Sequence, residues 1–312
     1  MDRDVATTSF CNAAVDVQSW YAAARSKDVR PGRVRSYRML NRRIAVYRDS
    51  TGTAHALDAR CPHLGADLGQ GEVVGDGLRC AFHHWSFGPD GACQSAPGLE
   101  RTPCRRVRSY PTVERWGIVW IFNGPQPLFE LPQPPGEERY YIWTLPAQHI
   151  RCHPHLVIGN GLDVAHMDAL HGLELLGTPR IIEIDRYRLA IDSRGRPRSR
   201  LMRRLTGYRR HEFAATFTTI GGNLAWLTVT EPLRFHVLFS GRVSERGGCD
   251  TQTVLFVPRG NPLRLPQALA CMYMILADDH RILDGLKFTH AFTPADAPLE
   301  RFARLVNAME VW

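Results

Sequence analysis

Residues 61–83 read CPHLGADLGQGEVVGDGLRCAFH, which is Cys-x-His, sixteen residues, then Cys-x2-His. Each half of this pattern offers one thiolate and one imidazole, so two loops could hold one compact metal centre. Zinc accepts two cysteines and two histidines, although zinc sites usually group Cys with Cys and His with His. A cluster with two thiolates on one iron and two imidazoles on the other fits the alternation better. We therefore predict that Cys61, His63, Cys80 and His83 bind a [2Fe–2S] cluster; His84 competes with His83, but the spacing favours His83.

The sequence around this pattern indicates a small all-β domain. Its strand-forming segments are rich in aromatic and β-branched residues and are bounded by turn residues. We place this domain at 1–125, because a proline-rich stretch follows it at 125–136. Strands are expected at 43–48, 55–58 and 116–122, and the segment 20–25 is ambiguous between helix and strand.

The second half of the chain mixes expected strands and helices, and we place it at 137–312. The strands suggest an antiparallel sheet, so the predicted fold class is α+β, with a helix-grip-like arrangement in this domain. Strands are expected at 181–191, 211–220, 224–230, 235–240 and 251–257, and helices at 160–171, 266–288 and 298–309.

A second metal-binding pattern lies in the expected helix at 160–171, which reads NGLDVAHMDALH. Two imidazoles and a carboxylate suit an iron(II) site that keeps positions open for dioxygen and substrate. On an ideal helix, Asp163, His166 and His171 would lie within an arc of about 140°. His171 would be at its edge, where Gly172 could end the helix. A lone helical histidine is usually structural, but the spacing Asn-x2-Asp-x2-His-x4-His is more specific.

The two patterns together resemble the catalytic subunits of the Rieske non-haem iron oxygenases, over nearly the whole chain. The resemblance implies that His166 and His171 bind a mononuclear Fe(II). It also implies that Asp163 bridges electron transfer between the cluster and this iron, and that Asn160 lies beside the iron.

The resemblance further implies a carboxylate ligand far downstream, in a late acidic helix. The segment 275–284 reads ILADDHRILD and offers three aspartates. We predict Asp279 as the third iron ligand, with Asp278 as the close alternative and Asp284 as the weaker one. Only 107 residues separate His171 from Asp279, which is short for the family and suggests a reduced cover over the pocket.

The resemblance implies a two-centre oxidation of a small molecule by dioxygen, with electrons supplied from outside. This sequence has no Gly-x-Gly-x-x-Gly dinucleotide pattern and no second ferredoxin-type cysteine set. The expected partner is therefore a separate NAD(P)H-dependent reductase, acting directly or through an acidic ferredoxin. A head-to-tail homotrimer is also implied, because in this family electrons usually cross between subunits.

Composition narrows the class of protein further. The net charge is +8, and only two of the 39 basic residues are lysine. Codon bias is the favoured explanation of this arginine content, and attraction to an acidic partner is the functional alternative. We expect the arginine-rich run 194–204 to be a solvated loop. Without a nucleic-acid-binding motif we expect no nucleic-acid partner. We also expect a cytoplasmic protein without a membrane span, because the N-terminus carries no apolar segment.

The substrate is expected to be hydrophobic or aromatic, and monooxygenation is favoured; demethylation, desaturation and N-oxygenation stay open. Five aromatic residues of the expected sheet are candidates for the pocket wall or for the core: Phe213, Phe217, Trp226, Phe235 and Phe239. The alternative function is a Rieske electron-transfer protein without oxygenase activity. The size of the chain and its second pattern argue against that alternative, since an electron carrier needs only the first domain.

Overall fold

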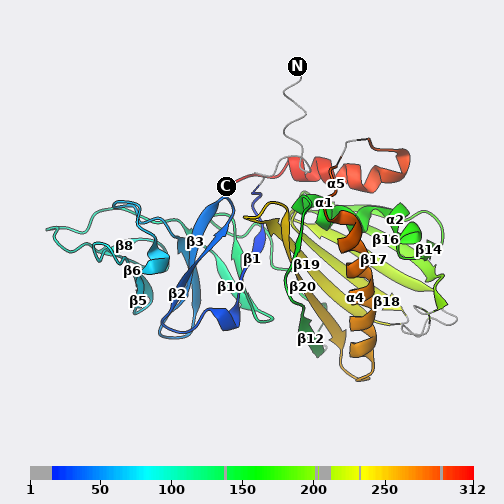
Figure 1. Ribbon diagram of the computed structural model, residues 1–312, viewed down its shortest axis with the longest axis horizontal. Helices are drawn as coiled ribbons and strands as arrows, with labels where there is room; N and C mark the ends of the chain where they lie inside the picture. Colours follow the sequence, from blue (N-terminus) through cyan, green and yellow to red (C-terminus); the bar gives the residue numbers. More distant parts are fainter. Residues whose placement is uncertain (1–15, 137–138, 201–202, 204–211, 232, 289–290) are drawn as a thin grey trace, which may run out of the picture. The chain divides into compact units, whose positions relative to one another are not determined.

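The computed structural model describes residues 16–136, 139–200, 203, 212–231, 233–288 and 291–312. These residues form two compact units (Figure 1). The N-terminal unit comprises Gln18–Glu130 with Trp312, and the C-terminal unit comprises Leu131–Val311 with the described residues before Gln18. The chain passes from one unit to the other inside the proline-rich stretch.

The N-terminal unit consists, in its described residues, of small antiparallel sheets. The first sheet has the order β1 (Trp20–Arg25), β11 (Ile118–Phe122), β10 (Thr112–Arg115). The second has the order β2 (Val34–Met39), β3 (Arg42–Arg48), β4 (Ala54–Asp58), β9 (Ser109–Tyr110). The third has the order β5 (Glu72–Val74), β6 (Gly77–Arg79), β7 (Ser86–Phe87), β8 (Cys93–Ser95). Single-turn helices are η2 (Ser26–Asp28) and η3 (Leu68–Gln70).

The central strand β11 explains why the first sheet forms. All five of its residues, IVWIF, are buried, and it pairs with a neighbour on each side. The ambiguous segment 20–25 is strand β1, whose Trp20 pairs with Phe122. The expected strands at 43–48 and 55–58 are confirmed as β3 and β4, and the expected strand 116–122 is confirmed from Ile118 onward. The predicted all-β character of this part of the chain is therefore confirmed.

The third sheet supports the two loops that carry the first cysteine–histidine pattern. Leu68 of η3, Leu78 of β6 and Phe87 of β7 are fully buried, and they pack in one cluster with Cys61 and Cys80. Burying such side chains contributes about 1.5–3 kcal/mol each. The loops are thus anchored by a small core of their own.

The C-terminal unit is one large antiparallel sheet with helices on it (Figure 1). Its strand order is β12 (Tyr140–Thr144), β20 (Cys249–Pro258), β19 (Phe235–Val243), β18 (Leu224–Glu231), β17 (Phe213–Ile220), β16 (Arg188–Pro197), β14 (Leu173–Leu175). In addition, β13 (Gln148–Ile150) pairs with β20, and β15 (Arg180–Asp185) pairs with β16. The helices are α1 (Pro154–Gly159), η4 (Asn160–Leu162), α2 (Val164–Ala169), α4 (Arg264–Leu283), η5 (Pro294–Asp296) and α5 (Ala297–Asn307).

Helix α4 lies along the sheet, as Figure 1 shows, because one of its faces is apolar. Ala268 and Met272 of this helix are buried with Val237 and Leu255 of the sheet. A second core joins α5 to α1 and η4, with Phe302 fully buried in it. These two cores hold the helical segments that carry the second metal-binding pattern. The predicted α+β class, with an antiparallel sheet and helices in the second half, is confirmed.

The expected helix at 160–171 is wrong as a continuous element. Residues 160–162 form the turn η4, and Asp163 then leaves the helical region with φ −76° and ψ 97°. Asp163 caps α2 instead, since its carboxylate accepts hydrogen bonds from the amides of Ala165 and His166. His171 follows the end of α2. The helical-wheel argument for one shared face therefore does not apply.

Other boundaries also differ from the prediction. The expected strand 181–191 is a hairpin, because β15 and β16 are separated by a turn at 186–187. The expected helix 266–288 spans Arg264–Leu283, and Asp284 ends it in an extended conformation. Arg194 and Arg196 lie in β16 and not in a loop. Most of the arginine-rich run beyond residue 200 lies outside the described residues. Position 211, the start of the expected strand 211–220, also lies outside them.

The remaining strands and the last helix agree with the prediction within a few residues: β17, β18, β19, β20 and α5. Across the residues that the structure describes, none of the helices has both the length and the hydropathy needed to span a bilayer.

Candidate functional site

Two loops of the N-terminal unit hold the first cysteine–histidine pattern in matching conformations. The amide of Cys61 donates to the carbonyl of Ala66 at 2.8 Å, and the amide of Cys80 donates to that of Trp85 at 2.8 Å. A second bond closes each loop onto its cysteine carbonyl, from the amide of Gly65 in one and from that of His84 in the other. Gly65 has φ +82° and His84 has φ +59°. The two loops are thus equivalent in backbone shape, and His84 stands where the first loop has glycine.

The imidazole rings of the two loops are in contact, edge to face. The ring centroids of His63 and His83 are 4.6 Å apart. Trp85 stacks on His63 with an interplanar angle of 3°. Nδ1 of His63 is buried and has no hydrogen-bond partner in the described part of the chain. A buried nitrogen without a partner is costly, and a metal bound to it would remove that cost.

Cys61 and Cys80 are buried in one core cluster with Trp85, the ring that stacks on His63. Burial raises the pKa of the Cys61 thiol to about 11, and the neighbouring Cys80 adds to this shift. A thiol with a pKa raised in this way stays neutral unless a metal stabilises its thiolate. His84, in contrast, is exposed. The candidate ligands are therefore two neighbouring thiols and the adjacent rings of His63 and His83, and this donor set fits a [2Fe–2S] cluster with mixed ligands.

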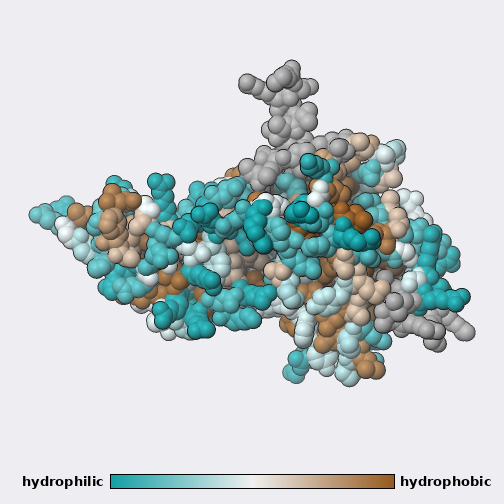
Figure 2. Space-filling view, viewed as in Figure 1, coloured by the Kyte–Doolittle hydropathy of each residue, from teal (hydrophilic) through white to brown (hydrophobic). Residues whose placement is uncertain are grey.

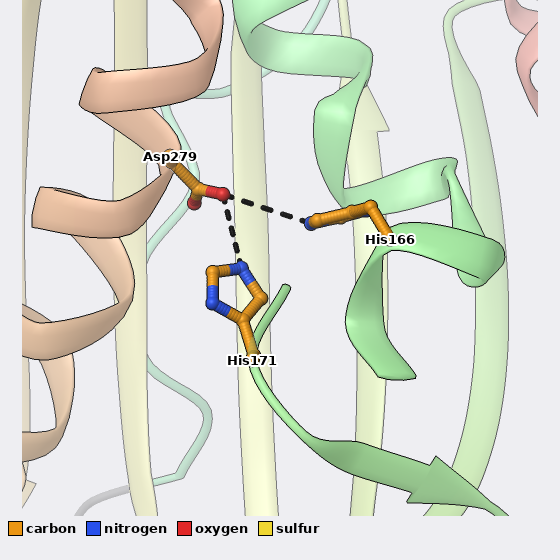
Figure 3. A group of neighbouring side chains, drawn as sticks. All are labelled: His166, His171 and Asp279. Carbon is orange, nitrogen blue, oxygen red and sulfur yellow. Dashed lines mark hydrogen bonds and ion pairs between the residues drawn. The ribbon is translucent and has the colours of Figure 1, made fainter. Parts of the chain in front are cut away.

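In the C-terminal unit, His166, His171 and Asp279 meet from two helices and the turn that follows the first of them (Figure 3). Oδ1 of Asp279 lies 3.0 Å from Nε2 of His171 and 3.7 Å from Nε2 of His166. His166 lies on α2, His171 lies between α2 and β14, and Asp279 lies on α4. One candidate ligand atom from each residue lies within 4.8 Å of the others. Two imidazoles and one carboxylate are the donor set of a 2-His-1-carboxylate iron site.

Local backbone structure orients the two histidines. The Nδ1–H group of His166 donates to the carbonyl oxygen of Asp163, which leaves Nε2 directed at Asp279. Gly172 adopts φ +60° and its amide donates to the carbonyl of Asp168. Glycine takes this left-handed conformation at little cost. The turn brings His171 back under α4, where its side chain is almost fully buried.

Asn160 completes the polar contacts of this group. Its Nδ2 donates to Oδ1 of Asp279 at 3.0 Å and lies 3.3 Å from Nε2 of His166. Burial lowers the pKa of His166, although Asp279 opposes this shift, so the imidazole is held towards its neutral form. Metal binding requires a neutral imidazole. The neutral form of His166 therefore favours binding of a metal cation by His166, His171 and Asp279.

The three candidate aspartates of the late acidic helix occupy different surroundings. Asp279 is mostly buried and faces both histidines. Asp278 is 42% exposed, and its nearest approach to the group is 3.9 Å, from Oδ2 to Nδ1 of His171. Asp284 forms an ion pair with Arg151 at 2.6 Å. The structure thus brings Asp279 together with the histidines, and it does not bring Asp284 to them. Asp163 contributes a carboxylate 4.0 Å from Nδ1 of His166.

A cavity of about 160 Å³ adjoins this group. His166, His171, Asp279 and Asn160 line it, and most of its other lining side chains are apolar. Four of the five aromatic residues proposed for its wall do line it: Phe213, Phe217, Phe235 and Phe239. Trp226 does not line the cavity, because it stacks on His236. Along β19, His236 alternates with residues that line the cavity, so it lies on the opposite face of the sheet.

Sequence reasoning missed the polar side chains in this apolar wall. Gln148 and Thr251 face each other across β13 and β20, and both line the cavity with Thr253. The alternation of Thr251 and Thr253 within an expected strand could have placed these two on one face. No strand was expected at Gln148, because a strand of three residues carries little pattern.

Comparison with known proteins adds independent information. The family of the Rieske [2Fe-2S] domain matches residues 19–111. Cholesterol 7-desaturase of Bombyx mori is 35% identical over 162 residues, which cover 50% of this chain and 36% of that protein. The oxygenase component of 3-ketosteroid-9-alpha-monooxygenase of Rhodococcus rhodochrous is 31% identical over 163 residues, covering 49% of this chain and 43% of that protein. The matches thus span less than half the length of these relatives.

Solved structures resemble nearly the whole chain. Dicamba monooxygenase bound to dicamba superposes with a TM-score of 0.67 at 19% identity, covering 93% of this chain and 96% of that one. The NdmA QL mutant of Pseudomonas putida CBB5 with caffeine superposes with a TM-score of 0.69 at 16% identity, covering 92% and 88%. Because the sequence identity is so low, these similarities establish the fold alone.

Proposed function

Because the chain carries a Rieske [2Fe–2S] domain and has the fold of Rieske oxygenase structures, we propose that it is an oxygenase component. It would use dioxygen and two electrons from a separate reductase to oxidise a hydrophobic or aromatic small molecule, with monooxygenation as the favoured outcome. The observation that carries this proposal is the convergence of His166, His171 and Asp279 beside an apolar cavity. An electron carrier has no use for such a cavity.

The residues have distinct proposed roles. Cys61, His63, Cys80 and His83 would hold the cluster, and His166, His171 and Asp279 would hold Fe(II). When bound, these centres supply electron transfer and dioxygen activation.

Within the chain, the carbonyl of Asp163 holds the Nδ1 proton of His166 and so presents its Nε2 to the metal position. Asn160 orients Asp279 by donating to Oδ1. Asp163 is the proposed link between the two centres, since its carboxylate lies near His166 and is one-third exposed.

The cavity supports a small apolar substrate. A cavity of about 150 Å³ lined by aliphatic and aromatic side chains can bind benzene, and the space beside the metal position measures about 160 Å³. The apolar walls exclude water from the reacting atoms. Gln148 and Thr251 would orient the substrate, because a few polar groups in an apolar pocket fix a ligand's direction.

The electron donor is proposed to dock on the loops of the cluster. Leu64 and Phe82 are 66% and 60% exposed, next to His63 and His83. Figure 2 shows apolar surface interrupting the hydrophilic surface over the part of this unit that carries β6 and β8. Arg60, next to the first loop, is exposed, and so is Arg105, whose guanidinium donates to the carbonyl of Pro62 in that loop. An apolar centre with a basic border suits an acidic ferredoxin or an acidic face of a reductase.

Two further expectations stay predictions. A head-to-tail homotrimer is proposed as the assembly, and sedimentation of the purified protein would measure its mass. A cytoplasmic location is also proposed, and fractionation of the source cells tests it.

A single-turnover experiment tests the function. The protein is reduced without oxygen, mixed with a small-molecule extract of its source, and exposed to ¹⁸O-labelled dioxygen before mass spectrometry. The proposal predicts a compound that gains labelled oxygen, or loses a methylene group or two hydrogens, with the wild type only. His166→Ala is the control and should leave every compound unchanged. If His166→Ala still passes electrons to an acceptor and the wild type, loaded with mononuclear iron, converts no compound in repeated extracts, the electron-carrier alternative is favoured.

A further inference from the structure

The two histidines of the metal group differ in how their second ring nitrogen is held. Nδ1 of His166 has an acceptor, the carbonyl oxygen of Asp163. Nδ1 of His171 is buried and has no hydrogen-bond partner within the described ranges. Metal-bound imidazoles almost always donate their other N–H to a carboxylate, a carbonyl or a water, which fixes the tautomer and the ring orientation. The acceptor for the Nδ1 proton of His171 is therefore not identified by any hydrogen bond among the described residues.

Asp278 is placed to be that acceptor. Its Oδ2 lies 3.9 Å from Nδ1 of His171, whereas Oδ1 of Asp279 lies 3.0 Å from Nε2 of the same ring. The two adjacent carboxylates thus approach opposite nitrogens of one imidazole. Asp278 is 42% exposed, and a shift of about 1 Å would bring its Oδ2 within hydrogen-bond distance of Nδ1.

Resting on the proposed function, we propose that Asp278 is a positioning residue for the iron site. Its carboxylate accepts the Nδ1 proton of His171 and so keeps Nε2 unprotonated and aimed at the metal. Asp279 supplies the ligand oxygen, and Asp278 supplies the orientation of a histidine ligand. The two neighbouring aspartates are then not interchangeable.

A purely structural role for Asp278 makes a different prediction. Oδ1 of Asp278 lies 3.6 Å from Nη2 of Arg281, one turn further along α4. If Asp278 served only this ion pair, Arg281→Gln would have the same effect as loss of Asp278. Exposed pairs of this kind contribute little, which corresponds to less than about fivefold in an equilibrium constant.

The test measures the Fe(II) dissociation constant of the mononuclear site by competition with a chromogenic chelator, using protein that retains its cluster. Wild type is compared with Asp278→Ala, Asp278→Asn, Arg281→Gln and Asp279→Ala. Cluster absorbance and thermal unfolding establish that each variant is folded. We expect Asp278→Ala to weaken Fe(II) binding by about 10- to 100-fold. Asp278→Asn keeps an acceptor oxygen and should lose less, and Arg281→Gln should stay within about fivefold of wild type.

The outcomes separate this inference from the proposed function. Wild-type affinity in Asp278→Ala, with binding lost in Asp279→Ala, overturns the role of Asp278 and leaves the iron site intact. Equal losses in Asp278→Ala and Arg281→Gln also overturn it, because they indicate the ion pair. If the wild type binds no Fe(II) beyond the cluster, or Asp279→Ala binds it unchanged, the proposed iron site itself fails.

Discussion

Gly161 allows the segment that carries Asn160 to lie directly on the ring of Phe217. A Cβ atom at position 161 would lie 2.4 Å from both Cε2 and Cζ of that ring. Carbon atoms pack at about 3.5–4.0 Å, so Gly161→Ala requires the ring or the segment to move by more than about 1 Å. Gly161 does not have a positive φ, so the substitution tests packing and not backbone strain. We expect a loss of about 1–3 kcal/mol in the free energy of unfolding.

A double-mutant cycle isolates this contact. Phe217→Ala removes the ring and should by itself cost about 3–5 kcal/mol. In that background the new methyl group meets no ring atoms, so adding Gly161→Ala should cost little. The coupling energy should therefore be about 1–3 kcal/mol, measured by urea unfolding of the four proteins with circular dichroism. Cluster absorbance reports separately on the N-terminal unit.

The same substitution should also disturb the metal group. Asn160 precedes Gly161 and donates to Asp279 at 3.0 Å, so a displaced segment weakens that bond. Fe(II) affinity should fall in Gly161→Ala and recover in part when Phe217→Ala is added. If the stability losses of the two single variants add up to the loss of the double variant within about 0.5 kcal/mol, the packing argument is refuted.

Other predictions concern the N-terminal unit. His84→Gly should retain the cluster and change stability by no more than about 1 kcal/mol, because glycine accepts its φ of +59°, whereas His83→Ala should lose the cluster absorbance. Burial acts to raise the pKa of Asp49, but hydrogen bonds from His55, Thr51 and Thr53 outweigh it and hold this pKa well below its usual value. The ionised Asp49 carboxylate should stabilise the fold fully above about pH 4. This stabilisation should disappear as the pH falls towards the pKa that Asp49 has in the folded protein. Asp49→Asn should therefore cost about 3 kcal/mol at pH 7 and flatten the acid side of the stability curve; an unchanged acid side would contradict this. Replacing Arg60 with Gln should slow reduction of the cluster by its donor and reduce the effect of salt on that rate, which stopped-flow absorbance measures; equal salt dependence in both proteins would exclude a role for Arg60.

The cluster loops were predictable because their signal is local. Cys61, His63, Cys80 and His83 lie within 23 residues, and the alternation of cysteine with histidine indicates the kind of metal centre. The choice of His83 over His84 rests on spacing, and the exposure of His84 and its left-handed position in the loop support this prediction. Strand β11 was predictable because a fully buried strand is apolar at every position.

The second site was harder because its parts are joined by tertiary packing. The choice between Asp278 and Asp279 depends on which face α4 turns to the histidines, and no local pattern in ILADDHRILD decides this. The break at Asp163 could have been anticipated, because aspartate is a favoured helix N-cap. The turn after Asp185 contains neither glycine nor proline, so the hairpin β15–β16 read as one strand.

The central claim is that the chain holds a second iron site, separate from the cluster, at His166, His171 and Asp279. Iron and acid-labile sulfide should be measured together in the wild type and in Asp279→Ala, after loading both with Fe(II) under the same conditions. The account predicts one more iron per chain in the wild type than in the variant, with equal sulfide and equal cluster absorbance. Equal iron in the two proteins would contradict the account.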